Sequence, residues 1–489
     1  MEKRKATYAE SILALLFMVV FVFVGFIAFD LPIELMMVLA AGCAGILARR
    51  LGYSWAELEN AISGRITGAT PAILIIWVIG IVISTFMFSG SIPMLIYYGI
   101  DIVTPQYLFV TSFLLCVVFS TITGTSWGSA GTAGLACMSI AAGFGLPLHI
   151  TAAAVVCGSI FGDKMSPLSE TTNLAAATSG VNLYDHIKSM MWTTGPAALI
   201  TLVFFYIIGL NMDAGSQGAS NDALAMQAGL AEMFHWSPLL LLPFVIILTG
   251  AFMRKPPVPT MLVACLSAIV IGVTYQGFTL KSGFDASLSG FQAAMVPGVD
   301  VAGIEESILT LLNRGGMVSM VGVVIIIFCG YAYTAIISKA GFLDTAIAPL
   351  ASRVKQRGPL MVTTLFTGFV LLVFSGISYT VAIMLPEMFK KSFLKAGMGA
   401  PTLSRSIEDV GTMMAAVIPW SASGAFYVAT LGVPLFGEGG FGVWAIMTYL
   451  TPIIAIILAF AGIGIYKVGK EEAKETIVKN ERKQFVESL

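Results

Sequence analysis

The sequence predicts an all-α polytopic membrane protein that contains two inverted-topology repeats with broken helices or re-entrant hairpins. The first observation is composition, because 57% of the 489 residues are hydrophobic and 11% are charged, whereas an ordinary soluble domain has about 25% charged residues. The second is a series of apolar runs, some long enough to cross a bilayer and some too short to cross alone. The third is a similarity between stretches about 250 residues apart.

The apolar runs predict about ten to twelve transmembrane helices, of which the first lie within residues 1–50. Basic residues precede the first run and follow the second, whereas residues 211–236 contain no lysine or arginine. The positive-inside rule therefore predicts a multi-pass protein of the cell membrane with both termini in the cytoplasm. The predicted divisions are N-terminal helices at 1–50, a first repeat at 51–210, an extracytoplasmic loop at 211–236, linking helices and a loop at 237–300, a second repeat at 301–466 and a cytoplasmic tail at 467–489.

The internal similarity has the same order in both halves of the chain. An acidic residue, Glu57 or Glu305, opens an amphipathic segment, and an arginine follows it, Arg65 or Arg314. Two further pairs of similar segments come next. Since the first unit starts on the predicted inside and the second on the predicted outside, the units are expected to be inverted. Secondary transporters with this architecture bind their substrates near the bilayer midplane, where the two repeats meet.

The segment 158–174, GSIFGDKMSPLSETTNL, places Asp163, Lys164 and Glu170 among apolar stretches. A charge at the centre of a membrane helix costs about 2.5–3.5 kcal/mol on insertion scales, so these residues are expected to face a polar cavity or a partner. A hard cation such as Na⁺ favours oxygen ligands. The alternative is a buried structural ion pair between Asp163 and Lys164. The expected cation- and proton-binding residues here are Asp163, Glu170, Thr172 and Asn173, with Na⁺ at Asp163, Thr172 and Asn173 and with Ser166, Ser169 and Thr171 in support.

Three more segments are expected to complete the site. Residues 120–133 are rich in glycine and offer the hydroxyl groups of Thr125 and Ser126, and residues 375–380 offer that of Ser378. In residues 406–412, Glu408 and Asp409 are adjacent carboxylates that point about 100° apart on a helix. We expect Asp409 to face the site while Glu408 pairs with Arg405. The alternative role for the hydroxyl groups is to form hydrogen bonds between helices. The alternative role for Glu408 is to cap the start of a helix.

A buried carboxylate can bind either a proton or a metal cation. Burial raises the pKa of a carboxyl group, and a bound cation lowers it again, so the two ligands compete and can be exchanged. The sequence has no HExxH or GxSG motif, and Asp163 with Asp409 as a protease dyad is strongly disfavoured, so a transporter rather than an enzyme is expected. No cofactor is expected besides Na⁺ and H⁺ as transported or coupling ions. With a net charge of −1, nothing indicates a nucleic acid partner.

The motif GDKMSPLSETTNLA, residues 162–175, closely resembles the signature of the NhaC family of Na⁺/H⁺ antiporters, in the ion transporter superfamily. The resemblance extends over about 55–465, and at position 170 the family more often has Asp where this chain has Glu170. It implies a carrier with inverted repeats and Na⁺ coupling through the residues from Asp163 to Asn173. The expected function is exchange of Na⁺ for H⁺ by alternating access at a midplane carboxylate site. The alternative is Na⁺- and H⁺-coupled exchange of a small organic anion, of the malate/lactate type, or of an amino acid. Lys164 and Arg405 would then bind its carboxylate, although we favour these two residues as internal counter-ions. A homodimer is compatible with the sequence.

Overall fold

The computed structural model describes residues 3–29, 31–212, 217–253, 255–299, 304, 308–309, 312–349 and 356–468. Helices dominate these residues, and the β pairing among them is a single bridge between Met398 and Lys467. The predicted cytoplasmic tail beyond Val468 lies outside the described residues. So do Glu305, which opens the second repeat, and three basic residues that contribute to the predicted topology, Arg254, Arg353 and Lys355.

The first part of the chain contains two N-terminal helices and a series of helices that ends at Leu210. A capping box at Thr7 starts the first helix, and another at Ser54 starts the long third helix. These elements are α1 (Tyr8–Val19), η1 (Val20–Ala28), α2 (Ile33–Arg50), α3 (Trp55–Phe88), α4 (Ser91–Ile102), η2 (Pro105–Tyr107), α5 (Leu108–Thr123), α6 (Ser126–Ser129), η3 (Ala130–Gly134), α7 (Leu135–Gly143), α8 (Leu148–Met165), α9 (Glu170–Ser179) and α10 (Leu183–Leu210).

A connecting region leads to the second series. Within the predicted extracytoplasmic loop 211–236, residues 217–233 form a helix. The elements are α11 (Gln217–Met233), η4 (Pro238–Leu241), α12 (Leu242–Phe252), α13 (Pro257–Thr274), α14 (Leu280–Ser289), η5 (Ala293–Met295), η7 (Met317–Met320), α16 (Val321–Lys339), α17 (Phe342–Ile347), α18 (Arg357–Ser375), α19 (Ser378–Lys395), α20 (Ala400–Gly411), η8 (Met414–Val417), α21 (Ala422–Leu431), η9 (Gly442–Trp444) and α22 (Ile446–Ala461).

Glycines in the left-handed region mark corresponding helix ends in the two series. Such a backbone conformation favours glycine because it has no Cβ. Gly124 ends α5 with a φ of 71°, and Gly376 ends α18 with a φ of 67°. Two other pairs occupy equivalent places: Gly90 and Gly341 before α4 and α17, and Gly180 and Gly432 after α9 and α21. The two series therefore repeat one pattern of helices, in support of the predicted duplication.

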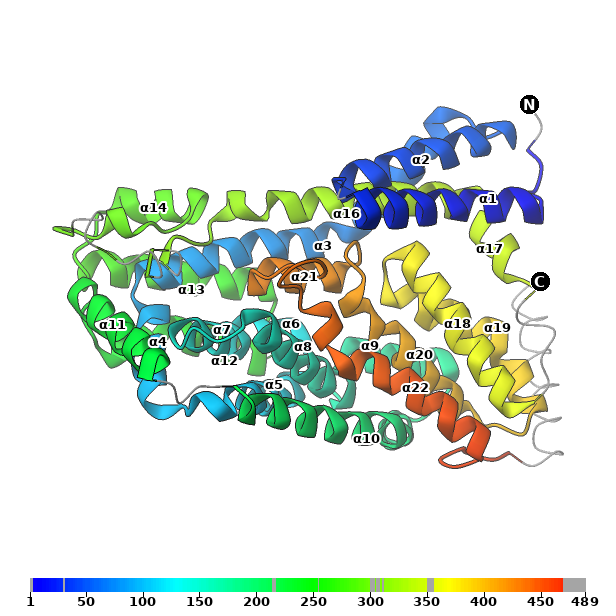
Figure 1. Ribbon diagram of the computed structural model, residues 1–489. Helices are drawn as coiled ribbons and strands as arrows, with labels where there is room; N and C mark the ends of the chain where they lie inside the picture. Colours follow the sequence, from blue (N-terminus) through cyan, green and yellow to red (C-terminus); the bar gives the residue numbers. More distant parts are fainter. Residues whose placement is uncertain are drawn as a thin grey trace.

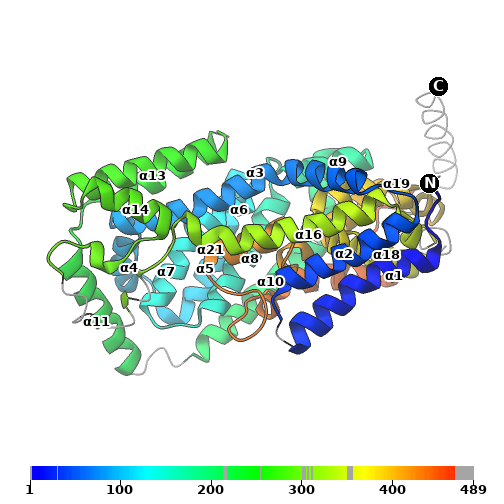
Figure 2. The same cartoon turned by 90° about the horizontal axis from the view of Figure 1, so that it is seen from above.

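The series run in opposite directions along the long axis of the molecule (Figures 1 and 2). Helix α3 starts near the end that holds the N-terminus, whereas α16 runs toward that end and α3 and α16 pack together. Short helices from the two series also interlock, because Trp127 of α6 stacks on Phe426 of α21 with ring centroids 4.4 Å apart. The broken segments of both series thus meet in the middle of the protein.

Seven helices in the described part of the chain are long and apolar enough to cross a membrane, and the number is nine if each of two sharply bent helix pairs forms one span. One bent pair joins the end of α11 to η4 and α12 at 101°, and the other joins α20 and η8 to α21 at 43°. Shorter apolar helices, α4 and α22, accompany them. The protein is an all-α polytopic membrane protein with broken helices, as predicted. The sequence-based number of about ten to twelve spans includes such shorter segments.

Candidate functional site

The candidate site lies where the end of α8 and the whole of α9, in the first series, meet α19 and α20 of the second. Asp163 and Lys164 end α8, and the chain turns at Pro167 before α9 begins at Glu170. Ser169 caps α9, with its hydroxyl accepting a hydrogen bond from the backbone N–H of Thr172. The break therefore places two acidic side chains at the ends of two short helices, next to the second series.

Asp163 is half-buried, and its carboxylate has a defined donor. The hydroxyl of Ser126, the first residue of α6, donates to Oδ2 of Asp163 at 2.8 Å. Thr125 caps α6, because its Oγ1 accepts from the N–H of Gly128 at 3.3 Å. Glu170 and Glu408 both lie within electrostatic range of Asp163. Carboxylates from both series therefore surround one region.

Glu170 lies at the solvent-accessible side of this region. Its Oε2 accepts a hydrogen bond of 2.8 Å from the hydroxyl of Tyr379, in the first turn of α19. Because Glu170 is in the first series and Tyr379 in the second, this bond joins the two series at their breaks. Glu170 is exposed, whereas the neighbouring Thr172 is fully buried.

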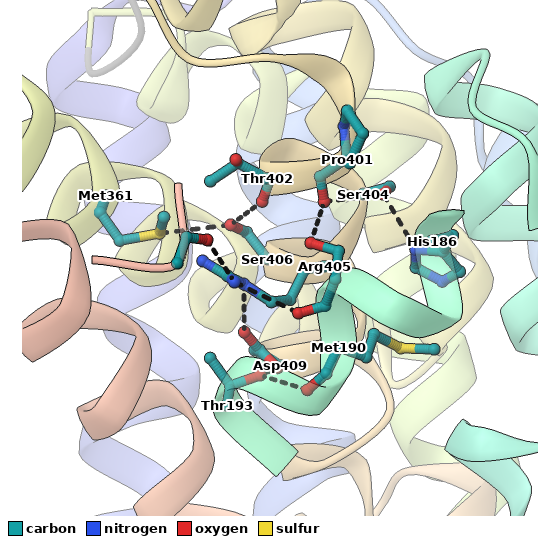
Figure 3. Close-up of polar contacts among 12 residues, drawn as sticks. His186, Met190, Thr193, Met361, Pro401, Thr402, Ser404, Arg405, Ser406 and Asp409 are labelled. Atoms are coloured by element: carbon teal, nitrogen blue, oxygen red, sulfur yellow. Dashed lines mark hydrogen bonds and ion pairs between the residues drawn. The ribbon is translucent and has the colours of Figure 1, made fainter. Parts of the chain in front are cut away.

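Lys164 and Asp409 form an ion pair in the interior. The distance from Lys164 Nζ to Asp409 Oδ1 is 2.5 Å, and both side chains are 0% exposed. The hydroxyl of Thr193 on α10 donates to the same carboxylate oxygen at 2.8 Å. Nε of Arg405 lies 3.9 Å from the other oxygen, Oδ2, one helical turn away on α20 (Figure 3). A buried charge needs such partners, because desolvation of each ion costs several kcal/mol.

The structure corrects two expectations about these charges. Arg405 pairs with Asp409 rather than with Glu408, because Nε of Arg405 lies 3.9 Å from Oδ2 of Asp409, and no ion pair is described between Arg405 and Glu408. Likewise, the considered pair between Asp163 and Lys164 does not form, since Lys164 reaches across to the second series.

Glu408 is 1% exposed and has a carboxylate oxygen, Oε2, without a hydrogen-bond partner. Lys164, Asp163 and Asp409 are the charged groups within its electrostatic range. A buried polar atom without a partner is rare and needs an explanation, such as a water or an ion. Oδ2 of Asp409 also lacks a hydrogen-bond partner, but Asp409 forms the ion pair with Lys164, so Glu408 is the one of the two adjacent carboxylates that no described ion pair holds.

Arg405 was predicted from the sequence to lie near the site, whereas His186 was not. Nη1 of Arg405 donates to the carbonyl oxygens of Ser189 at 3.2 Å and Gly464 at 3.0 Å, whereas its Nε and Nη2 have no hydrogen-bond partner. His186 is fully buried, and its Nδ1 lies 2.9 Å from Oγ of Ser404 (Figure 3). Oγ of Ser404 also lies 3.1 Å from the carbonyl oxygen of Pro401, and Nε2 of His186 has no hydrogen-bond partner.

A helical spacing could have revealed the contribution of α10. His186, Ser189 and Thr193 recur at three- and four-residue intervals, which places them on one face of the helix. Ser189 donates to the carbonyl of Pro401 at 2.8 Å, so this face contacts α20 along its length. Polar residues at a helical period within an apolar span are therefore the signal that was missed.

The remaining predicted hydroxyl and amide groups mostly bond to the backbone. Asn173 is exposed, and its amide nitrogen donates to the carbonyls of Pro167 and Ser169 at 2.9 and 2.7 Å. Thr172 donates to the carbonyl of Lys164 at 3.0 Å. The other three contacts are Ser166 to the carbonyl of Thr121 at 2.9 Å, Ser378 to that of Gly411 at 2.8 Å, and Ser169 to Thr171 at 3.1 Å. These residues hold the break in shape, and no described contact brings the Asn173 and Asp163 side chains together.

Two interlocked series of broken membrane helices with charged side chains buried between them define the class of ion-coupled secondary transporters. Among the described residues, no three histidine, cysteine, aspartate or glutamate side chains are arranged to hold a metal ion, so a permanent metal centre of that kind is not seen there. Similarities to known proteins identify the particular family.

A profile of the Na⁺/H⁺ antiporter family matches residues 158–463, and the chain belongs to this family, of the NhaC type. It is 34% identical to the Na⁺/H⁺ antiporter NhaC of Alkalihalophilus pseudofirmus, over 96% of this chain and 98% of that one. It is 31% identical to the malate-2H⁺/Na⁺-lactate antiporter of Bacillus subtilis, over 88% and 90% of the two chains. It is 30% identical to the arginine/ornithine antiporter ArcD of Halobacterium salinarum, over 97% and 96%.

Proposed function

We propose that this protein exchanges Na⁺ for H⁺ across the cell membrane by alternating access, with both termini in the cytoplasm and with Asp163 and Glu408 as its central carboxylates. The single observation that carries this proposal is the free Oε2 of buried Glu408, within electrostatic range of Asp163 from the other series. A carboxylate in such a place binds a proton or a cation, because either ligand neutralises a charge that water cannot reach.

Asp163 offers the Na⁺ ligands. Its oxygens lie next to the hydroxyl of Ser126, which can turn its lone pairs toward a cation. The hydroxyl oxygen of Thr172 is the next candidate ligand for Na⁺, since it lies 3.4 Å from the backbone carbonyl oxygen of Asp163. Asn173 would contribute its amide oxygen only after the break rearranges, because its amide nitrogen is bonded to the backbone on the exposed side. Glu170 would deliver the ion from solvent to Asp163.

The competition between the two ligands accounts for coupling. Any factor by which Na⁺ lowers proton affinity is matched by the factor by which a proton lowers Na⁺ affinity. The ion pair of Lys164 with Asp409 would keep the two series aligned while Asp163 and Glu408 change their ligands. Alternation between the two sides would then come from movement of one series against the other.

A second function, exchange of an organic anion or amino acid together with Na⁺ and H⁺, has its own observation. Nε and Nη2 of Arg405 form one edge of the guanidinium group, are buried and have no hydrogen-bond partner. This edge is the one that binds a carboxylate through two parallel hydrogen bonds. Names of two relatives, a malate-2H⁺/Na⁺-lactate antiporter and an arginine/ornithine antiporter, agree with such a substrate.

Reconstituted vesicles with a preformed pH gradient distinguish the two functions. Addition of Na⁺ alone should dissipate the gradient if Na⁺ and H⁺ are exchanged directly, as a pH-sensitive dye in the vesicle lumen would report. If the gradient responds only when malate, lactate or an amino acid is also present, direct exchange is wrong and the second function holds. Vesicles without protein and vesicles with K⁺ in place of Na⁺ are the controls.

A further inference from the structure

A pocket of about 510 Å³ lies at the end of the molecule opposite the N-terminus, where α4 and α11 meet (Figures 1 and 2). It lies at the sharp bend between α11 and α12, far along the chain from the carboxylates of the candidate site. Six residues line it, four of them with aromatic rings other than histidine: Tyr97, Ala231, Phe234, His235, Trp236 and Tyr275.

The aromatic rings of the pocket are arranged against one another. The ring centroids of Tyr97 and Trp236 are 4.9 Å apart with planes tilted by 33°, and those of Phe234 and Trp236 are 6.3 Å apart and stacked. The hydroxyl of Tyr275 donates to the carbonyl of Trp236 at 2.8 Å, which fixes the position of the Tyr275 ring beside Trp236. Trp236 is thus at the centre of the aromatic lining, and a tryptophan ring forms the strongest cation–π contacts of the aromatic side chains.

The backbone at the bend is held by one buried glutamine. Gln276 is 8% exposed, and its amide accepts from the N–H of His235 at 2.9 Å and donates to the carbonyl of His235 at 3.0 Å. It also donates to the carbonyl of Ser89 at 3.1 Å. Both polar backbone groups of His235 are therefore satisfied, and the pocket wall is fixed without a ligand.

One carboxylate, that of Asp101, lies close to the pocket lining. None of the six lining residues is a lysine or arginine, and residues 211–236 contain neither. Asp101 lies one helical turn beyond Tyr97 on α4, and Gln227 donates both to the carbonyl of Tyr97 at 2.8 Å and to Oδ1 of Asp101 at 3.0 Å. A carboxylate therefore lies beside the aromatic walls, where it favours a positively charged ligand.

We propose that this pocket binds an organic ammonium ion against its aromatic lining, with Trp236, which Tyr97 and Phe234 contact, as the central ring. Aromatic walls with a neighbouring carboxylate favour alkylated ammonium groups, because the large soft cation is weakly hydrated and gains from the ring quadrupoles. Metal ions such as Na⁺ are excluded as the ligand, since they require oxygen ligands in place of their water. The same chemistry is present in a free solute and in the headgroup of a choline lipid.

Choline binding to the purified protein in a choline-free detergent tests the proposal. Titration calorimetry should detect binding of choline and of tetramethylammonium, but not of 3,3-dimethylbutan-1-ol, which has the shape of choline without its charge. Trp236→Leu should weaken choline binding by about three- to thirtyfold, the range that one cation–π contact supplies. Trp236→Phe should weaken it less, because a ring remains. Trp55→Leu, at an exposed tryptophan that starts α3 at the other end of the molecule, is the matched control.

Equal binding of choline and its uncharged analogue, or choline binding by Trp236→Leu as strong as that by the natural protein, would overturn the proposal. Thermal unfolding curves show whether both Trp236 variants are folded. If Trp236→Leu does not fold, a folded Trp236→Phe still tests the proposal. Lipid nanodiscs identify the source of the ligand. A headgroup ligand predicts that choline binds more weakly in phosphatidylcholine than in phosphatidylethanolamine nanodiscs, which have the same net charge but no choline headgroup, whereas a free solute predicts equal affinity in both. None of these readouts depends on ion exchange.

Discussion

Lys164 and Asp409 are 245 positions apart in the sequence, yet their charged atoms lie 2.5 Å apart in the protein interior. One residue ends a helix of the first series, and the other lies within a helix of the second. Because Thr193 also donates to Asp409, the pair has a hydrogen-bonded environment and is not two isolated charges. It is the closest charged contact between the two series among the described residues.

Lys164→Met should destabilise the protein more than a typical core substitution. It leaves Asp409 charged and buried, and removal of one partner of a buried pair costs about 3–5 kcal/mol. The double variant Lys164→Met/Asp409→Leu removes both charges, so its loss should be smaller than the sum of the two single losses. Thermal unfolding in detergent measures all three, and additive losses would contradict an interaction between the pair.

Asp163→Asn should abolish Na⁺-driven proton movement in vesicles while the protein stays folded. The asparagine side chain has the same shape and keeps an oxygen that can accept from Ser126, but it has no charge to exchange. Asp185→Asn is the control, because Asp185 is exposed in the first turn of α10. Full activity of Asp163→Asn would remove this residue from the site.

Glu408→Gln and Asp409→Asn should have opposite consequences, although the residues are neighbours. Glu408→Gln breaks no described hydrogen bond of Oε2, so stability should be kept while coupling is lost. Asp409→Asn removes the counter-ion of Lys164 and should lower the unfolding temperature. The measurement is a melting curve together with Na⁺ affinity for each variant.

The pH dependence of Na⁺ affinity tests whether Glu408 binds the proton that competes with Na⁺. A protonated carboxylate cannot hold Na⁺, so Na⁺ affinity of the natural protein should rise with pH until the carboxylate is fully ionised, by up to about tenfold per pH unit for one proton. Glu408→Gln should flatten this rise, since one competing proton is absent. A pH profile equal to that of the natural protein would assign proton binding to another residue.

Composition and charge were sufficient for the fold class, since few charges and long apolar runs have no other stable arrangement. The apolar surroundings of Lys164 in the sequence also indicated that its charge would face a partner. The partner of Lys164 could not be predicted, because it depends on how two distant series pack. The exposed position of Asn173 could not be predicted either, since an asparagine can serve as a cation ligand or can cap backbone carbonyls.

Close packing of α5 against α8 supports the break, and Gly158 tests it. A Cβ at Gly158 would lie 2.2 Å from the carbonyl oxygen of Phe113, a backbone atom that cannot move without displacement of α5. Gly158→Ala should therefore cost about 1–3 kcal/mol of stability by overpacking, and it should also reduce exchange, because α8 carries Asp163 at its end. Gly131→Ala is the matched control, because a Cβ there meets no atom within 4 Å, and alanine in a helix is at least as favourable as glycine. Melting temperatures and vesicle assays of the two variants should separate clearly. Equal behaviour of both would mean that the contact between α5 and α8 does not set the position of Asp163.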